Sequence, residues 1–102
     1  MRIILMTIEQ FEPMHPGTFI KEVYLTPFGI GSNQLARELK LSKGMVSRLL
    51  NGNASVTPDI SLRLSTVLGR SPESWLRMQD NFDLSYAKPR FNAEEFKPLQ
   101  FA

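Results

Sequence analysis

Apolar residues return every three or four positions through most of the chain, which is the spacing of an amphipathic helix. Proline and glycine interrupt this pattern at short intervals, and both residues mark the starts and ends of helices. The pattern therefore predicts several short helices, with no apolar run of the length that spans a membrane. The predicted helical segments are 16–25, 32–39, 43–51, 58–68 and 72–88.

The last two predicted helices begin with the same two-residue signal. Thr57 and Ser71 are good N-caps, because a side-chain oxygen there accepts a hydrogen bond from a free backbone N–H group. Each is followed by a proline, Pro58 or Pro72, whose missing N–H does no harm at the first helical position. Gly69 separates the two helices. Five short helices of this kind predict an all-α domain.

The length of 102 residues predicts one domain with one hydrophobic core. Residues 1–12 include a short β-branched run, which is a candidate strand for the sheet of a partner. Met6 and Met14 are alternative translation starts, so the role of this segment is left open. The predicted organisation is an N-terminal segment over 1–14, a helical domain over 15–89 and a tail over 90–102, with both ends non-helical.

Segments 32–39 and 43–51 meet at Lys40 with no proline and no loop between them. Counted from Ser32, the fifth place is the small Ala36, and five further places are apolar at helix-turn-helix spacing. The ninth place, the turn, is most often glycine because its backbone tends to be left-handed. Lys40 stands there, at an expected cost of about 1 kcal/mol. The five apolar residues are Leu35, Leu39, Leu41, Val46 and Leu49.

Burial of these apolar residues leaves one polar face of segment 43–51 exposed. A helix with such a face fits the major groove of DNA, where Lys43 and Arg48 can donate to guanine or to phosphate. Gly44 costs about 1 kcal/mol inside a helix, which is understandable if the helix must come close to the groove. The alternative is an ordinary corner between two helices with solvated polar residues. The predicted DNA-facing residues are Ser42, Lys43, Gly44, Ser47 and Arg48.

The net charge of +2 is unevenly distributed along the chain. Residues 31–70 hold six basic and two acidic side chains, a net charge of +4. Residues 1–30 hold two basic and three acidic side chains, and residues 71–102 hold four and five, so each has a net charge of −1. A local basic region indicates a polyanionic partner. A solvated face with no such partner is the alternative.

Three stretches of residues 14–86 resemble one family. These stretches are "HPG", "VSRLLNG…TPDISLRL" and "LGRSPESWLRMQ", and the last is the most specific because a generic helix-turn-helix has no need of it. The chain resembles the HigA antitoxins, also called plasmid-maintenance antidotes, of the phage-repressor-like class. Thr18 stands where the family usually has glutamate. The resemblance implies a five-helix, lambda-repressor-like DNA-binding domain.

The resemblance also implies a homodimer that binds a palindromic operator in double-stranded DNA and represses its own operon. It further implies that the protein neutralises HigB, a small toxin that cleaves mRNA on the ribosome. A stand-alone phage- or plasmid-type repressor without a toxin is the main alternative, and a helical interaction module without DNA binding is another. The family's DNA-reading positions fall on Ser42, Lys43, Met45, Ser47 and Arg48, and its backbone-supporting positions fall near Ser32, Asn33 and Asn51.

Dimer contacts in the family usually involve the last helix and the residues after it. In this chain the apolar side chains of the tail would form an unusual exposed patch on a monomer. We therefore expect the tail to pack across a dimer, or on the last helix of the same chain. The candidate interface residues are Trp75, Met78, Phe82, Tyr86, Phe96, Leu99 and Phe101.

No catalytic or metal-binding group of residues stands out. His15 is the only histidine and the chain has no cysteine, so a metal ion would lack its usual ligands. We expect His15 to be structural, at the start of the first helix. Residues 29–31 are too short for a phosphate-binding loop and follow no strand. The sequence predicts a cytoplasmic binding protein that is not an enzyme and uses no cofactor and no metal.

Overall fold

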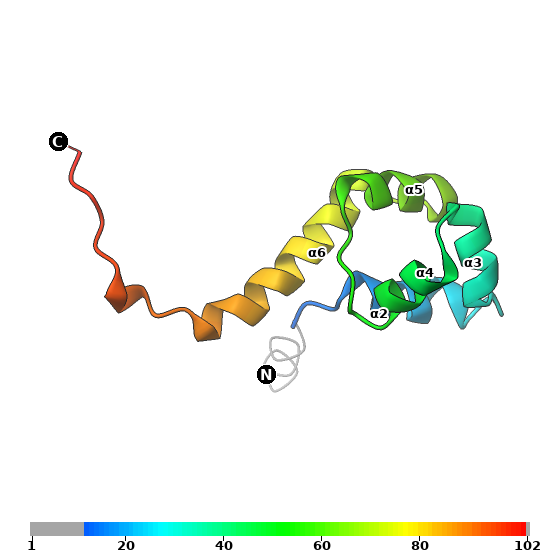
Figure 1. The fold of residues 1–102 in the computed structure, drawn as a ribbon, viewed down its shortest axis with the longest axis horizontal. Coiled ribbons are helices and arrows are strands. Elements are labelled where there is room, and N and C mark those ends of the chain that lie inside the picture. Colours follow the sequence, from blue (N-terminus) through cyan, green and yellow to red (C-terminus); the bar gives the residue numbers. More distant parts are fainter. Residues whose placement is uncertain (1–11, 102) are drawn as a thin grey trace, which may run out of the picture.

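The computed structural model describes residues 12–101, and this part of the chain is helical with no strand. The helices form a compact group, from which the last one leads away toward the C-terminus (Figure 1). The all-α, five-helix prediction is confirmed, with boundaries close to those expected. The elements are α2 (Pro16–Ile20), η1 (Lys21–Leu25), α3 (Ser32–Leu39), α4 (Lys43–Leu50), α5 (Pro58–Leu68), α6 (Pro72–Ala87), η2 (Lys88–Arg90) and η3 (Ala93–Glu95).

The predicted caps are present at the helix starts. The side chain of Thr57 accepts a hydrogen bond from the backbone N–H of Ile60 at 3.2 Å, and that of Ser71 accepts one from Ser74 at 3.0 Å. These bonds satisfy N–H groups that have no partner within the helix. The prolines that follow both caps occupy the first turns of α5 and α6. Local sequence therefore determines where these helices begin.

The first predicted helix differs from expectation in its hydrogen bonding. Residues 16–25 are continuous, but the second half, η1, is a π-helix in which the Thr26 N–H donates to the Lys21 carbonyl at 2.9 Å. Ile20 and Leu25 are five residues apart and both are buried. In an α-helix such residues would point in different directions, whereas bonding from residue i to i+5 keeps them on one face.

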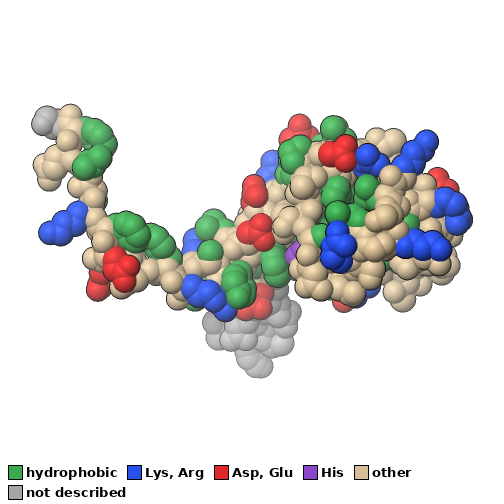
Figure 2. All heavy atoms as spheres, in the orientation of Figure 1, with side chains coloured by type: hydrophobic (Ala, Val, Ile, Leu, Met, Phe, Trp, Pro, Cys, Tyr) green, Lys and Arg blue, Asp and Glu red, His purple; other side chains and the backbone are tan. Residues whose placement is uncertain are grey.

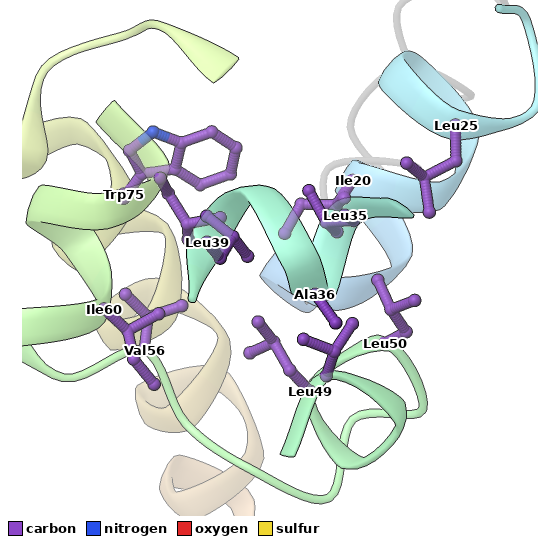
Figure 3. Close-up of a cluster of buried hydrophobic side chains, with 12 residues drawn as sticks. Ile20, Leu25, Leu35, Ala36, Leu39, Leu49, Leu50, Val56, Ile60 and Trp75 are labelled. Carbon is purple, nitrogen blue, oxygen red and sulfur yellow. The ribbon is translucent and has the colours of Figure 1, made fainter. Parts of the chain in front are cut away.

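The core lies between all five helices (Figure 3). The Trp75 side chain has no exposed surface, and its indole N–H donates to the Gly69 carbonyl at 2.9 Å. Of the five predicted apolar residues of the helix-turn-helix, four are buried and Leu41 is partly buried. The core residues are Ile20, Leu25, Leu35, Ala36, Leu39, Val46, Leu49, Leu50, Val56, Ile60, Leu64 and Trp75.

The tail extends away from the domain beyond α6 (Figure 1). It is not wholly non-helical as predicted, because η2 and η3 are short 3-10 turns. Phe96, Leu99 and Phe101 are 61%, 76% and 90% exposed. They therefore do not pack on α6 of the same chain, which was one of the two expectations. Phe96 instead stacks on Phe91, with ring centroids 5.2 Å apart.

Candidate nucleic-acid interface

The turn between α3 and α4 has the left-handed backbone that the helix-turn-helix spacing predicts. Lys40 has φ 58° and ψ 42°. Its N–H donates to the Arg37 carbonyl at 3.2 Å, and the Leu41 N–H donates to the Ala36 carbonyl at 3.0 Å. This pair of bonds is a Schellman motif, which usually ends in glycine because other residues are strained there. Lys40 therefore needs support from elsewhere in the fold.

Arg63 of α5 supplies this support. Its Nη1 donates to the carbonyl oxygens of Leu39 and Lys40, at 2.8 and 3.0 Å. Its Nε donates to Asp59 Oδ2 at 2.8 Å, which fixes the guanidinium group. The positive charge lies at the C-terminal end of α3, where the helix dipole is negative. Arg63 thus ties the turn to α5.

Sequence reasoning did not find this role of Arg63. The residue lies 23 and 24 positions from the carbonyls that it contacts, so no local pattern connects them. The i,i+4 spacing of Asp59 and Arg63 predicts an ion pair on the surface of a helix. It does not predict that the same guanidinium reaches another element.

α4 begins at a strong cap and presents a polar face. The Ser42 Oγ accepts a hydrogen bond from the Met45 N–H at 3.0 Å. Arg48 extends back along the helix, and its Nη2 approaches the Met45 sulfur at 3.8 Å. A Cβ added at Gly44 would have only the end of the Arg48 side chain nearby, at 3.9 Å. Packing within the described residues therefore does not explain the glycine.

The sequence-predicted DNA-facing residues lie at the start of α3 and along α4 with its two caps. All of them are exposed except Met45, which is partly buried. Lys and Arg side chains are frequent around the end of the molecule that contains α3 and α4, whereas Asp and Glu are frequent near α6 and the tail (Figure 2). The exposed residues are Ser32, Asn33, Ser42, Lys43, Gly44, Ser47, Arg48 and Asn51.

Part of this face is an open groove of about 410 Å³ between η1, the start of α3 and the outer side of α4. Three predicted residues line it, namely Ser32, Ser47 and Asn51. Lys21 and Thr26 line it as well, and the sequence pattern assigned neither of them to the site. From the sequence, the helix of Lys21 was predicted only to pack against the core. The groove forms where η1 lies beside α4 in the fold, and no local pattern predicts that position.

The loop between α4 and α5 is hydrogen-bonded to α6. Gln79 is buried, and its Oε1 accepts a hydrogen bond from the Val56 N–H at 2.8 Å. Its Nε2 donates to Asp83 Oδ1 at 3.0 Å. A buried amide therefore connects α6 to this loop at Val56.

His15 lies at the start of α2. Its predicted structural role at the start of the first helix is confirmed. Its Nδ1 accepts a hydrogen bond from the Gly17 N–H at 2.9 Å, which caps α2. Its ring meets the Phe82 ring edge-on, with centroids 5.0 Å apart. Burial lowers the pKa of His15 below 6.5, although the Asp83 carboxylate and a backbone hydrogen bond at Ala54 act in the opposite direction.

Two further features are absent from residues 12–101. No group of three or more His, Cys, Asp or Glu side chains lies close enough to hold a metal ion there. No helix of this region is long and apolar enough to cross a membrane.

Known proteins share both the sequence pattern and the fold. A family model described as "Helix-turn-helix" matches residues 22–75, about half of the chain. Antitoxin HigA-1 of Vibrio cholerae is 35% identical over 89 residues, which cover 85% of this chain and 84% of that protein.

Solved structures agree with this sequence match. An addiction module antidote protein of the HigA family from Coxiella burnetii has a TM-score of 0.77 at 33% identity, covering 87% of this chain and 100% of that one. The antitoxin GraA in complex with its operator has a TM-score of 0.75 at 33% identity, covering 88% of this chain and 91% of that one. The fold of this chain is therefore similar to that of the solved HigA-family antidote protein and of GraA.

Proposed function

Because the chain belongs to the HigA antitoxin family of helix-turn-helix proteins, we propose that it binds operator DNA through α4 and represses the operon that encodes it. The observation that carries this proposal is the exposed polar face of α4, which follows a turn fixed by Arg63. The GraA structure supports it, since that similar antitoxin was solved with its operator. Specific binding requires a helix held rigidly at a defined angle, and this turn provides one.

The two ends of α4 have different tasks in this proposal. Helix-turn-helix proteins read base edges with the N-terminal residues of the second helix. Lys43 and the guanidinium of Arg48 are the donors at that end, and a bidentate contact with guanine O6 and N7 is open to arginine. Ser47 is short enough to let the helix backbone come close to the groove. Residues of the start of α3 and the end of α4 contact the DNA backbone and set the register.

The protein acts as a homodimer on a palindromic operator. Two copies of α4 then enter successive major grooves about 34–36 Å apart. The surface that supports dimer formation is the apolar part of α6 and the tail, because Leu84 and Tyr86 are 54% and 59% exposed and the tail side chains are more so. Trp75 is left out of this interface, since it is fully buried in the core of its own protomer. The proposed contacts are Met78, Phe82, Tyr86, Phe96, Leu99 and Phe101.

The second activity is neutralisation of a HigB-like, mRNA-cleaving toxin in the cytoplasm. The supporting observation is the similarity to proteins named as antitoxins and as an addiction module antidote, over most of the chain. Residues 1–12 were expected to offer a strand to a toxin, and 1–11 lie outside the described residues. A repressor without a toxin would have the same α4 face, so the toxin requires its own experiment.

Two measurements test this function. Fluorescence anisotropy with DNA from upstream of the gene should show binding that is at least a hundredfold tighter than to unrelated DNA of the same length. Co-expression with the adjacent small reading frame should restore growth that the frame alone arrests. Equal binding to both DNA sequences would contradict the repressor. A neighbouring frame without toxicity would favour the stand-alone repressor.

A further inference from the structure

The "HPG" segment, residues 15–17, packs directly against the end of α4. All three residues are buried, and α2 lies beside α4 (Figure 1). A Cβ added at Gly17 would overlap the carbonyl oxygen of Leu49 and would lie 2.9 Å from Leu50 Cα, closer than Cβ atoms are found to other atoms. The close approach of α2 to the last two residues of α4 therefore depends on the absence of a side chain at Gly17.

The His15 ring packs against both α6 and the turn that follows α4. It meets the Phe82 ring of α6 edge-on, with centroids 5.0 Å apart. A Cβ added at Gly52, in the turn, would lie 3.8 Å from His15 Cγ, which is ordinary van der Waals contact. The Gly17 N–H donates to His15 Nδ1 at 2.9 Å, so this ring and the glycine are held together. One short segment thus contacts the end of α4 and also α6.

The position of α4 relative to α6 matters because α6 belongs to the proposed dimer interface. A two-fold axis repeats in the partner any shift of α4 that occurs in one protomer. Successive major grooves lie about 34–36 Å apart, so the two α4 helices must keep this separation to bind both halves of a palindrome. The contacts between α4 and α6 within each protomer therefore contribute to the half-site spacing that the dimer fits.

We propose that residues 15–17 are the spacer that sets the position of α4 relative to α6, and with it the separation of the two α4 helices in the dimer. Gly17 and His15 are positioning residues, because both are buried and act through α4. The inference rests on the proposed binding of a palindromic operator and adds the residues that determine its half-site spacing. It gives the "HPG" segment a function beyond the start of a helix.

Gly17→Ala tests the spacer on two DNA fragments, the palindrome upstream of the gene and a fragment with one half-site. A half-site needs only one α4, whereas the palindrome needs both at the correct separation. The preference of the variant for the palindrome should fall by about tenfold, similar to the loss from one mismatched base pair. Fluorescence anisotropy well below the unfolding temperature of each protein ensures that the affinities refer to folded molecules.

Ile60→Val is the matched control for lost stability. It removes one buried methyl group from the core in α5, outside residues 15–17. The thermal unfolding temperature should fall, because deletion of a buried methyl group is destabilising. The preference for the palindrome over the half-site should nevertheless equal that of the wild type. A purely structural role of Gly17 would give the same result as this control.

A distance measurement tests the spacer without DNA. Because the chain has no cysteine, Lys43→Cys places a single spin label per protomer at the exposed start of α4. Pulsed electron paramagnetic resonance then reports the distance between the two labels in the dimer. Gly17→Ala should shift or broaden this distance distribution, whereas Ile60→Val should leave it unchanged.

His15→Asn keeps the experiment decisive if Gly17→Ala does not fold. Asparagine can still cap α2 but lacks the ring that contacts Phe82, so the preference for the palindrome should fall in the same direction. An unchanged preference and an unchanged label distance in a folded variant would overturn the spacer. Equal losses on palindrome and half-site would overturn it as well. If the wild type binds both fragments equally, the proposed dimeric binding fails first, before any variant is made.

Discussion

The guanidinium of Arg63 donates a hydrogen bond to the carbonyl oxygen of Lys40, at 3.0 Å, and so connects α5 to the turn of the helix-turn-helix. The same nitrogen reaches the Leu39 carbonyl at 2.8 Å. Both carbonyls are at the end of α3, where backbone oxygens lack helical partners. The strained turn and its distant support therefore form one unit.

Replacement of Arg63 should destabilise the fold. Arg63→Met keeps much of the apolar stem and removes both bonds to the turn, so the free energy of unfolding should fall by about 1.5–3 kcal/mol, the range for bonds to a charged group. Denaturant unfolding measures this value. Asp59→Asn is the control, because it removes the exposed ion pair but keeps the Arg63 side chain that bonds to the turn, and it should cost less than about 1 kcal/mol. Equal losses for the two variants would show that the turn does not depend on Arg63.

Lys40→Gly should stabilise the protein. Glycine removes the cost of about 1–2 kcal/mol that a side chain pays in left-handed backbone. Its greater freedom in the unfolded chain offsets about 0.4–1 kcal/mol of this gain. Chemical denaturation should therefore give a net gain below about 1.5 kcal/mol. Lys40→Ala keeps the strained Cβ and should give no such gain, so equal stabilities for these two variants would contradict the account of the turn.

Gly44→Ala should separate stability from DNA binding. An added methyl group would meet nothing closer than the end of the Arg48 side chain at 3.9 Å, so the helix should gain up to about 1 kcal/mol in stability from the better helix former. Operator affinity should nevertheless fall, because the methyl group occupies the space between α4 and the DNA. Anisotropy and thermal unfolding of the same sample give both values. An unchanged operator affinity would mean that the glycine does not serve close approach.

Stability should depend on pH through His15. Burial lowers the folded-state pKa below 6.5, so the unfolded chain takes up the proton first as the pH falls. The stabilising contribution is therefore complete above pH 6.5 and is lost from there down to the folded-state pKa. Protonation of Nδ1 also removes the acceptor for the Gly17 N–H.

The control for this pH effect is His15→Asn, which can still cap α2 but does not titrate. Between about pH 7.5 and pH 5.5, which bracket the ordinary histidine pKa, the unfolding free energy should fall more in the wild type than in the variant. Parallel losses in the two proteins would assign the pH dependence to other groups.

Helix positions were predictable because their determinants are local. The cap and proline pairs at Thr57 and Ser71 mark starts within two residues, and these starts were confirmed. The left-handed backbone at Lys40 followed from spacing alone. In contrast, the contact of Arg63 with the turn and the position of Lys21 beside α4 depend on elements that are distant in sequence.

Apolar periodicity also has a limit that α6 illustrates. Trp75, Met78, Phe82 and Tyr86 share one stripe in the sequence, and all four were predicted to be interface residues. In the structure Trp75 is fully buried whereas Tyr86 is 59% exposed, because α6 leaves the domain along its length. The stripe predicts which face is apolar but not where along the helix the core ends.

The most direct test of the central claim is operator binding by Arg48→Ala. The affinity for the gene's own upstream DNA should fall by about 1–3 kcal/mol, and the preference should relax at one base position. Anisotropy with a set of single-base operator variants measures both effects. A uniform loss across all sequences would make Arg48 a backbone contact, and undiminished binding by the variant would contradict the assignment of α4 as the DNA-reading helix.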